Sequence, residues 1–148
     1  MNKINIRPII QKDYNEYIEM AKEFYSMPCC DHNVDIIHFQ NAFDFCLLDN
    51  PYSKLFMIEF NKEIVGYGNI ALTYSIEAGG NVVLLEELFI KPNYRNLGIG
   101  KEYFSFIYKN YPANRYRLEV TESNKRAISL YEKLGYEFLG YMQMIKEK

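Results

Sequence analysis

The stretch that most constrains the fold of this chain runs from Leu85 to Gly100. It begins as an apolar strand with two adjacent acids, turns at Pro92, and ends in a glycine-containing loop that opens a helical pattern. Pro92 cannot donate a hydrogen bond to a strand ladder, so it ends the strand. Gly98 and Gly100 lack a Cβ, so backbone N–H groups from Asn96 to Lys101 can converge on a ligand. Because the first N–H groups of a helix lack internal partners and carry partial positive charge, the loop predicts a site for an anion such as a pyrophosphate.

Two familiar glycine motifs fit this loop less well. A P-loop requires a glycine where Arg95 stands, and a serine or threonine after its lysine, whereas Lys101 is followed by Glu102. A dinucleotide-binding fingerprint requires a third glycine, and that position is Tyr103. For the loop taken alone, a strand–turn–helix connection without a ligand is the alternative interpretation.

Composition indicates an ordinary globular chain. Its 148 residues are 49% apolar and 24% charged, which favours a single domain over residues 1–148. The net charge of −2, with both signs interspersed, gives no indication of nucleic acid or an anionic membrane as partner. The first residues contain no long apolar run, so we expect neither a signal peptide nor a membrane span. The three cysteines have no metal-type spacing and their odd number argues against a disulfide framework, so we expect a cytoplasmic protein.

Apolar spacing predicts the order β-α-α-β-β-β-α-β-α-β-β, an α/β (α+β) fold with a mixed, mostly antiparallel sheet and about four helices on its two faces. The predicted strands are Lys3–Pro8, Lys54–Asn61, Glu63–Tyr74, Asn81–Lys91, Tyr116–Thr121, Tyr136–Leu139 and Tyr141–Lys146. The predicted helices are Lys12–Tyr25, a helix from about Asn33 to just before Asn50, Gly98–Asn110 and Asn124–Leu134. Gly135 is the expected C-cap of the last helix.

A second motif lies near the C-terminus, where Asn124 is followed seven residues later by Tyr131, and then by Gly135-Tyr136. This run resembles the Asn…Ala…Leu-Tyr-x-x-x-Gly-Phe/Tyr signature of the GNAT superfamily of N-acyltransferases. The run Arg95-x-x-Gly98-x-Gly100 resembles the acyl-CoA loop of the same superfamily. The resemblance covers the chain from about Ile4 to its end, and its specific part is Leu85–Tyr136.

The resemblance implies a GNAT fold and an acetyl-CoA-dependent N-acetyltransferase that needs no metal. The pyrophosphate of CoA would lie on the loop made of Arg95, Asn96, Leu97, Gly98, Ile99, Gly100 and Lys101. The rest of the cofactor would contact Leu88, Phe89, Ile90, Asn124 and Tyr131, and the N–H of Leu88 would face the developing oxyanion. The family commonly has glycine where this chain has Asn96, but asparagine tolerates positive φ better than other residues with side chains.

Two adjacent acids, Glu86 and Glu87, are candidates for the general base. Neighbouring strand residues point to opposite faces, and both faces are otherwise apolar. The row with Glu86 holds Val82, Leu84, Leu88 and Ile90, and the row with Glu87 holds Val83, Leu85 and Phe89. Apolar surroundings raise the pKa of a carboxyl group toward values useful for proton abstraction. Spacing does not choose between the two acids. Polyamine-type GNAT enzymes use the first acid of such a pair, so we choose Glu86; a structural acid is the alternative.

The resemblance makes Tyr131 the general acid that protonates the CoA thiolate. Tyr131 also falls on the apolar stripe of its helix, so a core tyrosine is the alternative. Asn124, which would bond the cofactor arm, can also act as a helix cap, and both roles are compatible.

The acceptor amine is not encoded by any motif. In the resembled fold it is set by the first two helices and the loops around Ser26–His32 and Tyr74–Gly80, so small amines, aminoglycosides, amino acids and protein amines all stay open. The first loop contains a group that we interpret as bordering the acceptor pocket, and not as a metal site or a Cys–His nucleophile: Cys29, Cys30, Asp31 and His32.

Two other functions are possible on this sequence. A non-catalytic acyl-CoA-binding module or sensor would need neither Glu86 nor Tyr131, and a nucleotide-binding enzyme is the weaker alternative. The expected partners are acetyl-CoA and an amine acceptor. The oligomeric state cannot be read from the sequence, although the resemblance allows a homodimer.

Overall fold

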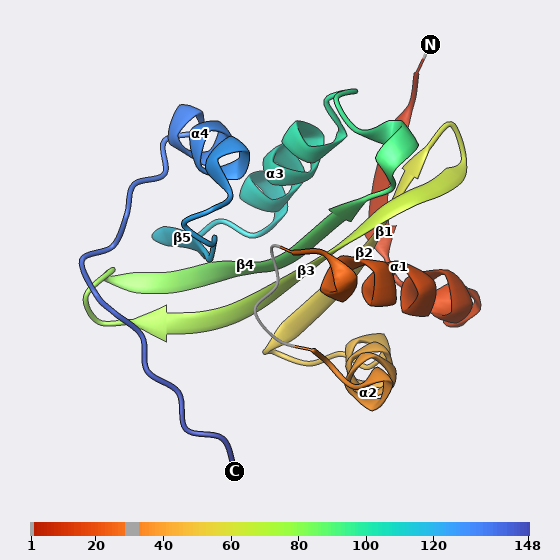
Figure 1. Ribbon diagram of the computed structural model, residues 1–148. Helices are drawn as coiled ribbons and strands as arrows, with labels where there is room; N and C mark the ends of the chain where they lie inside the picture. The colour runs from red at the N-terminus through yellow and green to blue at the C-terminus, as the bar shows by residue number, and fades with distance from the viewer. Residues whose placement is uncertain (1, 29–32) are drawn as a thin grey trace.

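The computed structural model describes residues 2–28 and 33–148. In these residues five strands form one sheet in the order β1-β2-β3-β4-β5 (Figure 1). The strands are β1 (Ile4–Pro8), β2 (Ser53–Phe60), β3 (Glu63–Ser75), β4 (Gly80–Ile90) and β5 (Arg115–Leu118). Neighbouring strands from β1 to β4 are antiparallel, and β5 joins β4 in parallel. The sheet is therefore mixed and mostly antiparallel, as the sequence predicts.

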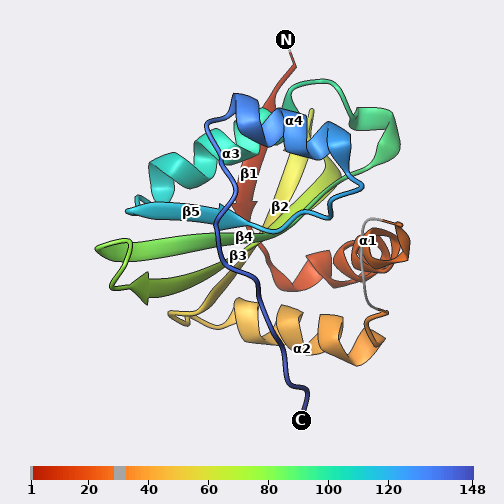
Figure 2. The same cartoon turned by 60° about the vertical axis from the view of Figure 1, so that its left-hand side comes forward.

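Helices cover both faces of the sheet (Figures 1 and 2). On one face lie α1 (Tyr14–Ser26) and α2 (Ile36–Leu47), and on the other lie α3 (Ile99–Asn110) and α4 (Lys125–Lys133). Short 3-10 turns precede α1 at Gln11–Asp13 and follow β4 at Pro92–Tyr94. This arrangement confirms the predicted fold class.

Two separate cores follow from the alternation of strand side chains. Leu55 and Met57 of β2 face α1 and α2, while Phe56 and Ile58 of the same strand face α3. All four side chains are at most 3% exposed. Because residues i and i+2 of a strand share a face, one strand serves both cores.

Most predicted elements form, with small shifts at their ends. The second helix begins at Ile36 and not near Asn33, because Asp35 is its N-cap and accepts a hydrogen bond from the Ile37 amide at 3.1 Å. The turn between β2 and β3 falls at Asn61 and Lys62, both with positive φ, as expected for a two-residue hairpin loop. The residues Cys29, Cys30, Asp31 and His32 lie outside the described part of the chain.

The prediction of two C-terminal strands is wrong. Neither Tyr136–Leu139 nor Tyr141–Lys146 forms a strand; the chain after α4 runs on without regular structure. The C-cap of α4 is Leu134 and not Gly135 as expected; the chain turns at Gly135, the next residue, which has a φ of 92°, and passes the outer side of β5. The residues have strand-forming character, but a strand also needs a neighbour that offers hydrogen bonds, and in the described sheet no strand pairs with this segment.

Candidate functional site

A β-bulge places the first of the two acids. Between β3 and β4, Asn69 pairs with Glu87 and Ile70 pairs with Leu85, so Glu86 is the extra residue. A bulge leaves its extra residue out of the ladder and shifts the alternation of side chains beyond it. Such bulges are frequent beside active sites, where they re-aim a side chain.

The bulge overturns the predicted rows of side chains. Val83 and Leu85, before the bulge, and Leu88 and Ile90, after it, all belong to the core under α3. Phe89 lies in the other core, under α1 and α2. A regular strand would have kept Leu85 and Phe89 on the same face of the sheet. The expected assignment of side chains to the two faces is therefore wrong beyond the extra residue.

Glu87 is held on the α1 side of the sheet. The Tyr67 hydroxyl donates a hydrogen bond to Glu87 Oε1 at 2.6 Å, and Tyr25 donates a second. Burial raises the pKa of Glu87, the two tyrosine hydrogen bonds oppose this rise, and the charge of Glu86 adds to it. This carboxylate is already engaged by two hydroxyl groups of its own chain.

Glu86 has a more accessible position. It is exposed, yet partial desolvation by its surroundings raises its pKa, and the nearby charge of Glu119 raises it further. Glu119 directly follows β5, so the two acids lie near each other where β4 and β5 end their pairing. An accessible carboxyl group with a raised pKa is suited to proton abstraction near neutral pH.

The pairing of β4 with β5 ends just before these acids. Their pairing runs from Val82 with Arg115 to Leu85 with Leu118 and ends there. On its other side, β4 stays paired with β3 as far as Ile90. From Glu86 to Ile90, the outer side of β4 therefore has no strand partner in the described sheet.

The amide of Leu88 points into this split. The Lys91 amide donates to the Val65 carbonyl of β3 at 2.8 Å. In an antiparallel ladder, alternate residues direct their backbone groups to the same neighbour, so the amides of Leu88 and Ile90 point away from β3. The Ile90 carbonyl agrees, because it accepts a hydrogen bond from Arg95 Nε at 2.8 Å on that side.

The glycine-containing loop has the geometry that its sequence predicts. Asn96 has a φ of 62° and Gly98 a φ of 80°, both in the left-handed region, and α3 begins at Ile99. Arg126 Nη2 of α4 donates to Asn96 Oδ1 at 2.5 Å, which ties the loop to the second motif. Asn96, which stands where the family commonly has glycine, therefore keeps the left-handed turn and adds a hydrogen bond with Arg126.

Open space lies in front of this loop. A Cβ built on Gly98 would meet no atom within 4 Å, and one built on Gly100 would meet only Leu88 Cδ2, at 3.8 Å. Leu97 and Lys101 are exposed, whereas the side chain of Ile99 is buried in the core below. The backbone of the loop thus faces free space while its buried isoleucine anchors it.

Arg95 and Asn124 have contacts within the chain. Besides its hydrogen bond to Ile90, the Arg95 guanidinium lies 5.8 Å from the centre of the Phe89 ring. The Asn124 side chain accepts a hydrogen bond from the Ala127 amide at 3.3 Å, so its role as a helix cap is confirmed. A second role toward a cofactor stays compatible with this bond.

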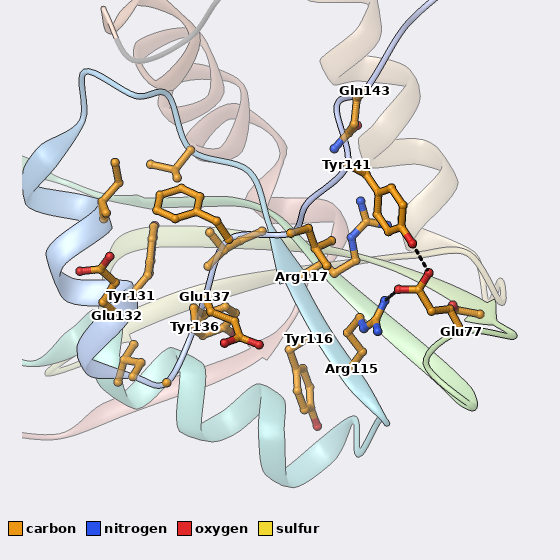
Figure 3. A pocket seen from close by; sticks show the side chains of 18 of the residues that line it. Glu77, Arg115, Tyr116, Arg117, Tyr131, Glu132, Tyr136, Glu137, Tyr141 and Gln143 are labelled. Carbon is orange, nitrogen blue, oxygen red and sulfur yellow. Dashed lines mark hydrogen bonds and ion pairs between the residues drawn. The ribbon is translucent and has the colours of Figure 1, made fainter.

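Tyr131 of α4 lies partly buried beside α3. Its ring centre is 6.0 Å from those of Phe104 and Tyr136. It lines a cavity of about 700 Å³ along the outer side of β5 (Figure 3). Among the described residues, those lining this cavity come from the β3–β4 turn, α3, β5 and the residues just after β5, α4 and the C-terminal segment, so Glu86 and the glycine-containing loop lie outside it.

Three features of this region were not predicted from the sequence. They are the bulge at Glu86, the charge of Glu119 near Glu86, and the hydrogen bond from Arg126 to Asn96 of the loop. Arg126 stands inside the second motif, but nothing in its spacing signals a contact 30 residues away. In residues 2–28 and 33–148, no three His, Cys, Asp or Glu side chains gather as metal ligands would. In the same residues, no helix has both the length and the apolar character needed to cross a membrane.

Comparison with known proteins identifies the family of this chain. The model of the acetyltransferase (GNAT) family matches residues 14–136. Thialysine N-epsilon-acetyltransferase of Mus musculus is 28% identical over 94% of this chain and 87% of its own length. Spermine/spermidine N(1)-acetyltransferase of Bacillus subtilis is 27% identical over 66% of this chain and 68% of its own length.

Solved structures show the same fold. A possible acetyltransferase from Clostridium difficile has a TM-score of 0.80 at 20% identity, covering 98% of this chain and 97% of its own. The aminoglycoside N-acetyltransferase AAC(6')-Iy, solved in complex with CoA, has a TM-score of 0.80 at 14% identity, covering 100% of this chain and 97% of its own. With the family model matching most of its length, the chain belongs to the GNAT family and is an acetyl-CoA-dependent N-acetyltransferase.

Proposed function

We propose that this protein transfers the acetyl group of acetyl-CoA directly to a primary amine, with both substrates held together in the split between β4 and β5. Direct transfer needs proximity, a donor for the oxyanion, a base for the ammonium proton and an acid for the thiolate. In this scheme the single chain acts as one catalytic domain in the cytoplasm.

The observation that carries the proposal is the split itself. Beyond Leu85 the outer side of β4 has no strand partner in the described sheet, and the alternation of the ladder directs the Leu88 amide to that side. A fixed amide of this kind stabilises a developing oxyanion by roughly 3 kcal/mol. The loop at Asn96–Lys101 follows directly and offers backbone amides at the start of α3 for the pyrophosphate.

Glu86 suits the role of base better than Glu87. Glu87 accepts hydrogen bonds from Tyr67 and Tyr25, so its carboxylate is fixed within the core. Glu86 is accessible, stands at the mouth of the split and has a raised pKa. It accepts the proton of the acceptor ammonium, directly or through water, and the free amine then attacks the thioester carbonyl.

Tyr131 completes the reaction by protonating the departing thiolate of CoA. Support comes from the placement of α4, whose first turn reaches the loop through the bond from Arg126 to Asn96. A cofactor whose pyrophosphate lies on the loop would extend past this helix toward the split. Asn124, at the N-terminus of the same helix, would contact the cofactor arm in addition to capping the helix.

For the acceptor we propose a small molecule with a primary amine. The mouse relative is named for the Nε of thialysine and the Bacillus relative for the N1 of spermine and spermidine. An acidic pair at the mouth of the split, Glu86 and Glu119, suits a cationic amine.

The test is the release of CoA thiol from acetyl-CoA with a panel of thialysine, lysine, spermidine, an aminoglycoside and a peptide amine. We expect turnover with at least one small amine, and a loss of about 100-fold or more in kcat for Glu86→Gln. Because Glu86 must be ionised to act as base, kcat of the native protein should rise with pH through its raised pKa, and this rise should be absent in the variant. Glu87→Gln is the matched control and should keep the pH profile.

Other outcomes would assign other functions. Thermal stabilisation by acetyl-CoA without turnover on any amine would leave a non-catalytic acyl-CoA-binding module. A pH profile abolished by Glu87→Gln and kept by Glu86→Gln would make Glu87 the base.

A further inference from the structure

Arg117 of β5 is a half-buried cation whose guanidinium has no partner in the part of the chain that the structure describes. The arginine two positions earlier is different, because Arg115 Nη1 lies 3.3 Å from Glu77 Oε1. Figure 3 shows both side chains, and a dashed line runs to Glu77 from Arg115 but not from Arg117. A cation that is partly removed from water and unpaired favours the approach of an anion. Arg117 is therefore a candidate to bind a negatively charged group of a ligand.

Arg117 lies on the face of the sheet that also carries α1 and α2. Tyr116 and Leu118 pack into the core under α3. Because neighbouring strand residues point to opposite faces, Arg117 points to the other face, and Glu119, two positions later, extends the same row. The charge of Glu119 raises the pKa of Glu86, so these two acids are close together. The unpaired cation therefore stands beside the acidic pair to which the acceptor ammonium is assigned.

Apolar surface lies next to Arg117 on the same face. Leu84 of β4 pairs with Arg117, and Ala71 of β3 pairs with Leu84. Leu84 and Ala71 are half-buried, and neither belongs to the two cores that the described residues form. Leu84 stands two residues before Glu86, so this surface adjoins the acidic pair as well as the cation. An aliphatic chain laid on it would have an acid at one end and a guanidinium at the other.

We propose that Arg117 binds a carboxylate of the acceptor, and that the acceptor is an amino acid acetylated on the amine at the end of its side chain. This inference rests on the proposed acetyl transfer and names the class of its acceptor. The ammonium lies at Glu86 and Glu119, the aliphatic chain on Leu84, and the carboxylate at Arg117. A guanidinium suits this last role, because its planar set of donors matches the two oxygens of a carboxylate.

The spacing of the charges selects the length of the acceptor. A strand rises about 3.3 Å per residue, so Glu86 stands about 7 Å along β4 from the residue that pairs with Arg117. An extended carbon chain gains roughly 1.25 Å per bond, so about five to six bonds separate the reacting amine from the carboxylate. Lysine, thialysine and ε-aminocaproate have chains of this length. The α-amine of an amino acid lies too close to its own carboxylate to span the two ends.

The same cation acts against diamines and polyamines. A second ammonium group at the far end of the acceptor would meet the guanidinium of Arg117, and like charges in a partly desolvated place repel each other. The acidic pair alone would accept either class of amine. Arg117 is thus the residue that separates the two classes, by attraction for one and repulsion of the other.

The experiment compares acceptors that differ only in this carboxylate. The kcat/KM is measured for ε-aminocaproate against ε-aminocaproamide and for lysine against lysinamide. The native protein should prefer the carboxylate in both pairs by about 10- to 100-fold, as expected for a charge-assisted contact. Arg117→Gln should bring both ratios close to one, through KM and not kcat, and Arg117→Glu should make cadaverine a better acceptor than ε-aminocaproate. Arg115→Gln, which removes a cation already paired with Glu77, is the matched control and should keep the native ratios.

A ratio of two acceptors within one variant does not depend on how much of that variant is folded. If the native protein acetylates amines with ratios near one, or if Arg117→Gln keeps the native ratios, Arg117 does not bind the carboxylate, although the proposed acetyl transfer stands. If the native protein acetylates no amine, the proposed function fails, and calorimetric titration of the CoA-loaded protein tests Arg117 by itself. Tighter binding of ε-aminocaproate than of its amide, lost in Arg117→Gln, would support the carboxylate site. Equal affinities in the native protein, or a preference that survives in Arg117→Gln, would overturn it.

Discussion

Gly98 and Gly100 allow the proposed anion site at the glycine-containing loop to be tested without disturbing the rest of the protein. Gly98 has a φ of 80°, so any side chain there strains the backbone even though nothing lies within 4 Å. Gly100 has no such φ, and its added Cβ would make an ordinary contact with Leu88 at 3.8 Å. Gly100→Ala therefore changes the space in front of the loop while leaving the folded chain free of strain.

The expected magnitudes differ for fold and for ligand. Gly100→Ala should leave the free energy of unfolding unchanged or raise it by up to about 1 kcal/mol, because alanine has less backbone freedom when unfolded. Gly98→Ala should lower it by about 1–2 kcal/mol, the cost of a left-handed conformation for a residue with a Cβ. If the methyl group of Gly100→Ala displaces the pyrophosphate from one amide, the loss of a charge-assisted hydrogen bond of about 1.5–3 kcal/mol raises the Kd for CoA about 10- to 150-fold.

Isothermal titration with CoA gives the Kd, and chemical denaturation without CoA gives the stability. Gly140→Ala is the matched control: a Cβ there also meets nothing within 4 Å and φ is not positive, but the residue lies in the C-terminal segment far from the loop in sequence. It should change neither quantity. Dephospho-CoA and pantetheine, used in parallel, separate the pyrophosphate contribution from that of the arm.

A specific result would refute the reasoning. If Gly100→Ala and Gly98→Ala both bind CoA with the native Kd, the amides of Asn96–Lys101 do not hold the pyrophosphate. If Gly100→Ala lowers stability as much as Gly98→Ala, the space in front of the loop is not free, and any loss of affinity would reflect damage to the fold.

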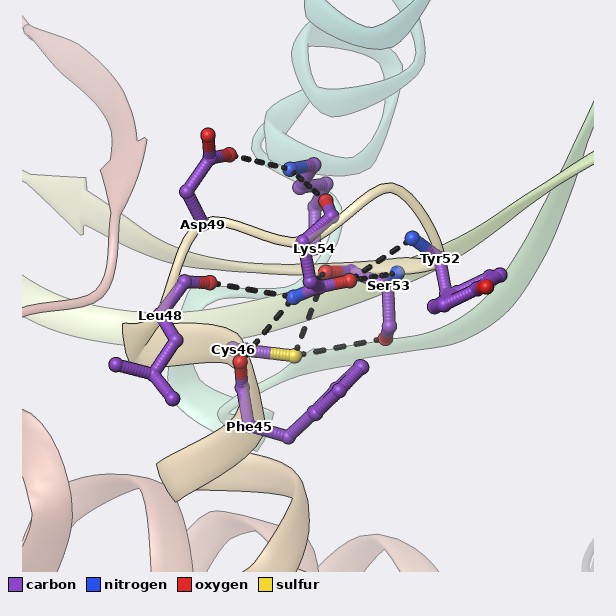
Figure 4. Close-up of polar contacts among 8 residues, drawn as sticks. Phe45, Cys46, Leu48, Asp49, Tyr52, Ser53 and Lys54 are labelled. Carbon is purple, nitrogen blue, oxygen red and sulfur yellow. Dashed lines mark hydrogen bonds and ion pairs between the residues drawn. The ribbon is translucent and has the colours of Figure 1, made fainter.

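Three further predictions concern the acid and two polar anchors of the fold. Tyr131→Phe should lower kcat by about 100-fold while keeping the Kd for acetyl-CoA, as single-turnover kinetics and titration can check; unchanged turnover with chemistry rate-limiting would remove it as the acid. Asp13→Ala should cost about 3 kcal/mol in urea denaturation, because it removes the buried carboxylate that accepts from Arg7 at 2.7 Å and leaves Arg7 with the less buried Glu59 as its partner. Burial alone would raise the pKa of Asp13, but hydrogen bonds from Arg7 and the Ile10 amide and the charge of Arg7 lower it. The contribution of Asp13 to the free energy of unfolding is therefore present above the pKa of the unfolded state and is lost as the pH falls through the lowered pKa of the folded state. An Asp13→Ala variant whose stability depends on acid as the native protein's does would contradict this. Asn50→Ala should cost about 2–4 kcal/mol, because its amide donates to three carbonyls and accepts from two amides around the α2–β2 turn (Figure 4), and an unchanged melting temperature would argue against that role.

The conformation of the glycine-containing loop could be predicted because it depends on a few adjacent residues. Positive φ at Gly98 needs glycine, and at Asn96 it is tolerated by asparagine, so the local sequence specifies the turn and the start of α3. The same holds for the hairpin at Asn61 and Lys62, and for the left-handed glycine, Gly135, that follows α4. In each case the information lies within about five residues of the feature.

The environment of the two acids could not be predicted in this way. The bulge at Glu86 depends on how β3 and β4 align, and that alignment joins residues such as Asn69 and Glu87, 18 positions apart in sequence. The hydrogen bond from Tyr67 to Glu87 likewise spans 20 residues. A period-two pattern assigns faces correctly only until the first extra residue, and the pattern itself carries no sign of that residue.

The C-terminal segment shows where local propensity stops being sufficient. Tyr136–Leu139 and Tyr141–Lys146 have the residues of strands, but a strand is defined by the neighbour that accepts and donates its backbone hydrogen bonds. In the described sheet no strand pairs with these segments, so the same residues are irregular.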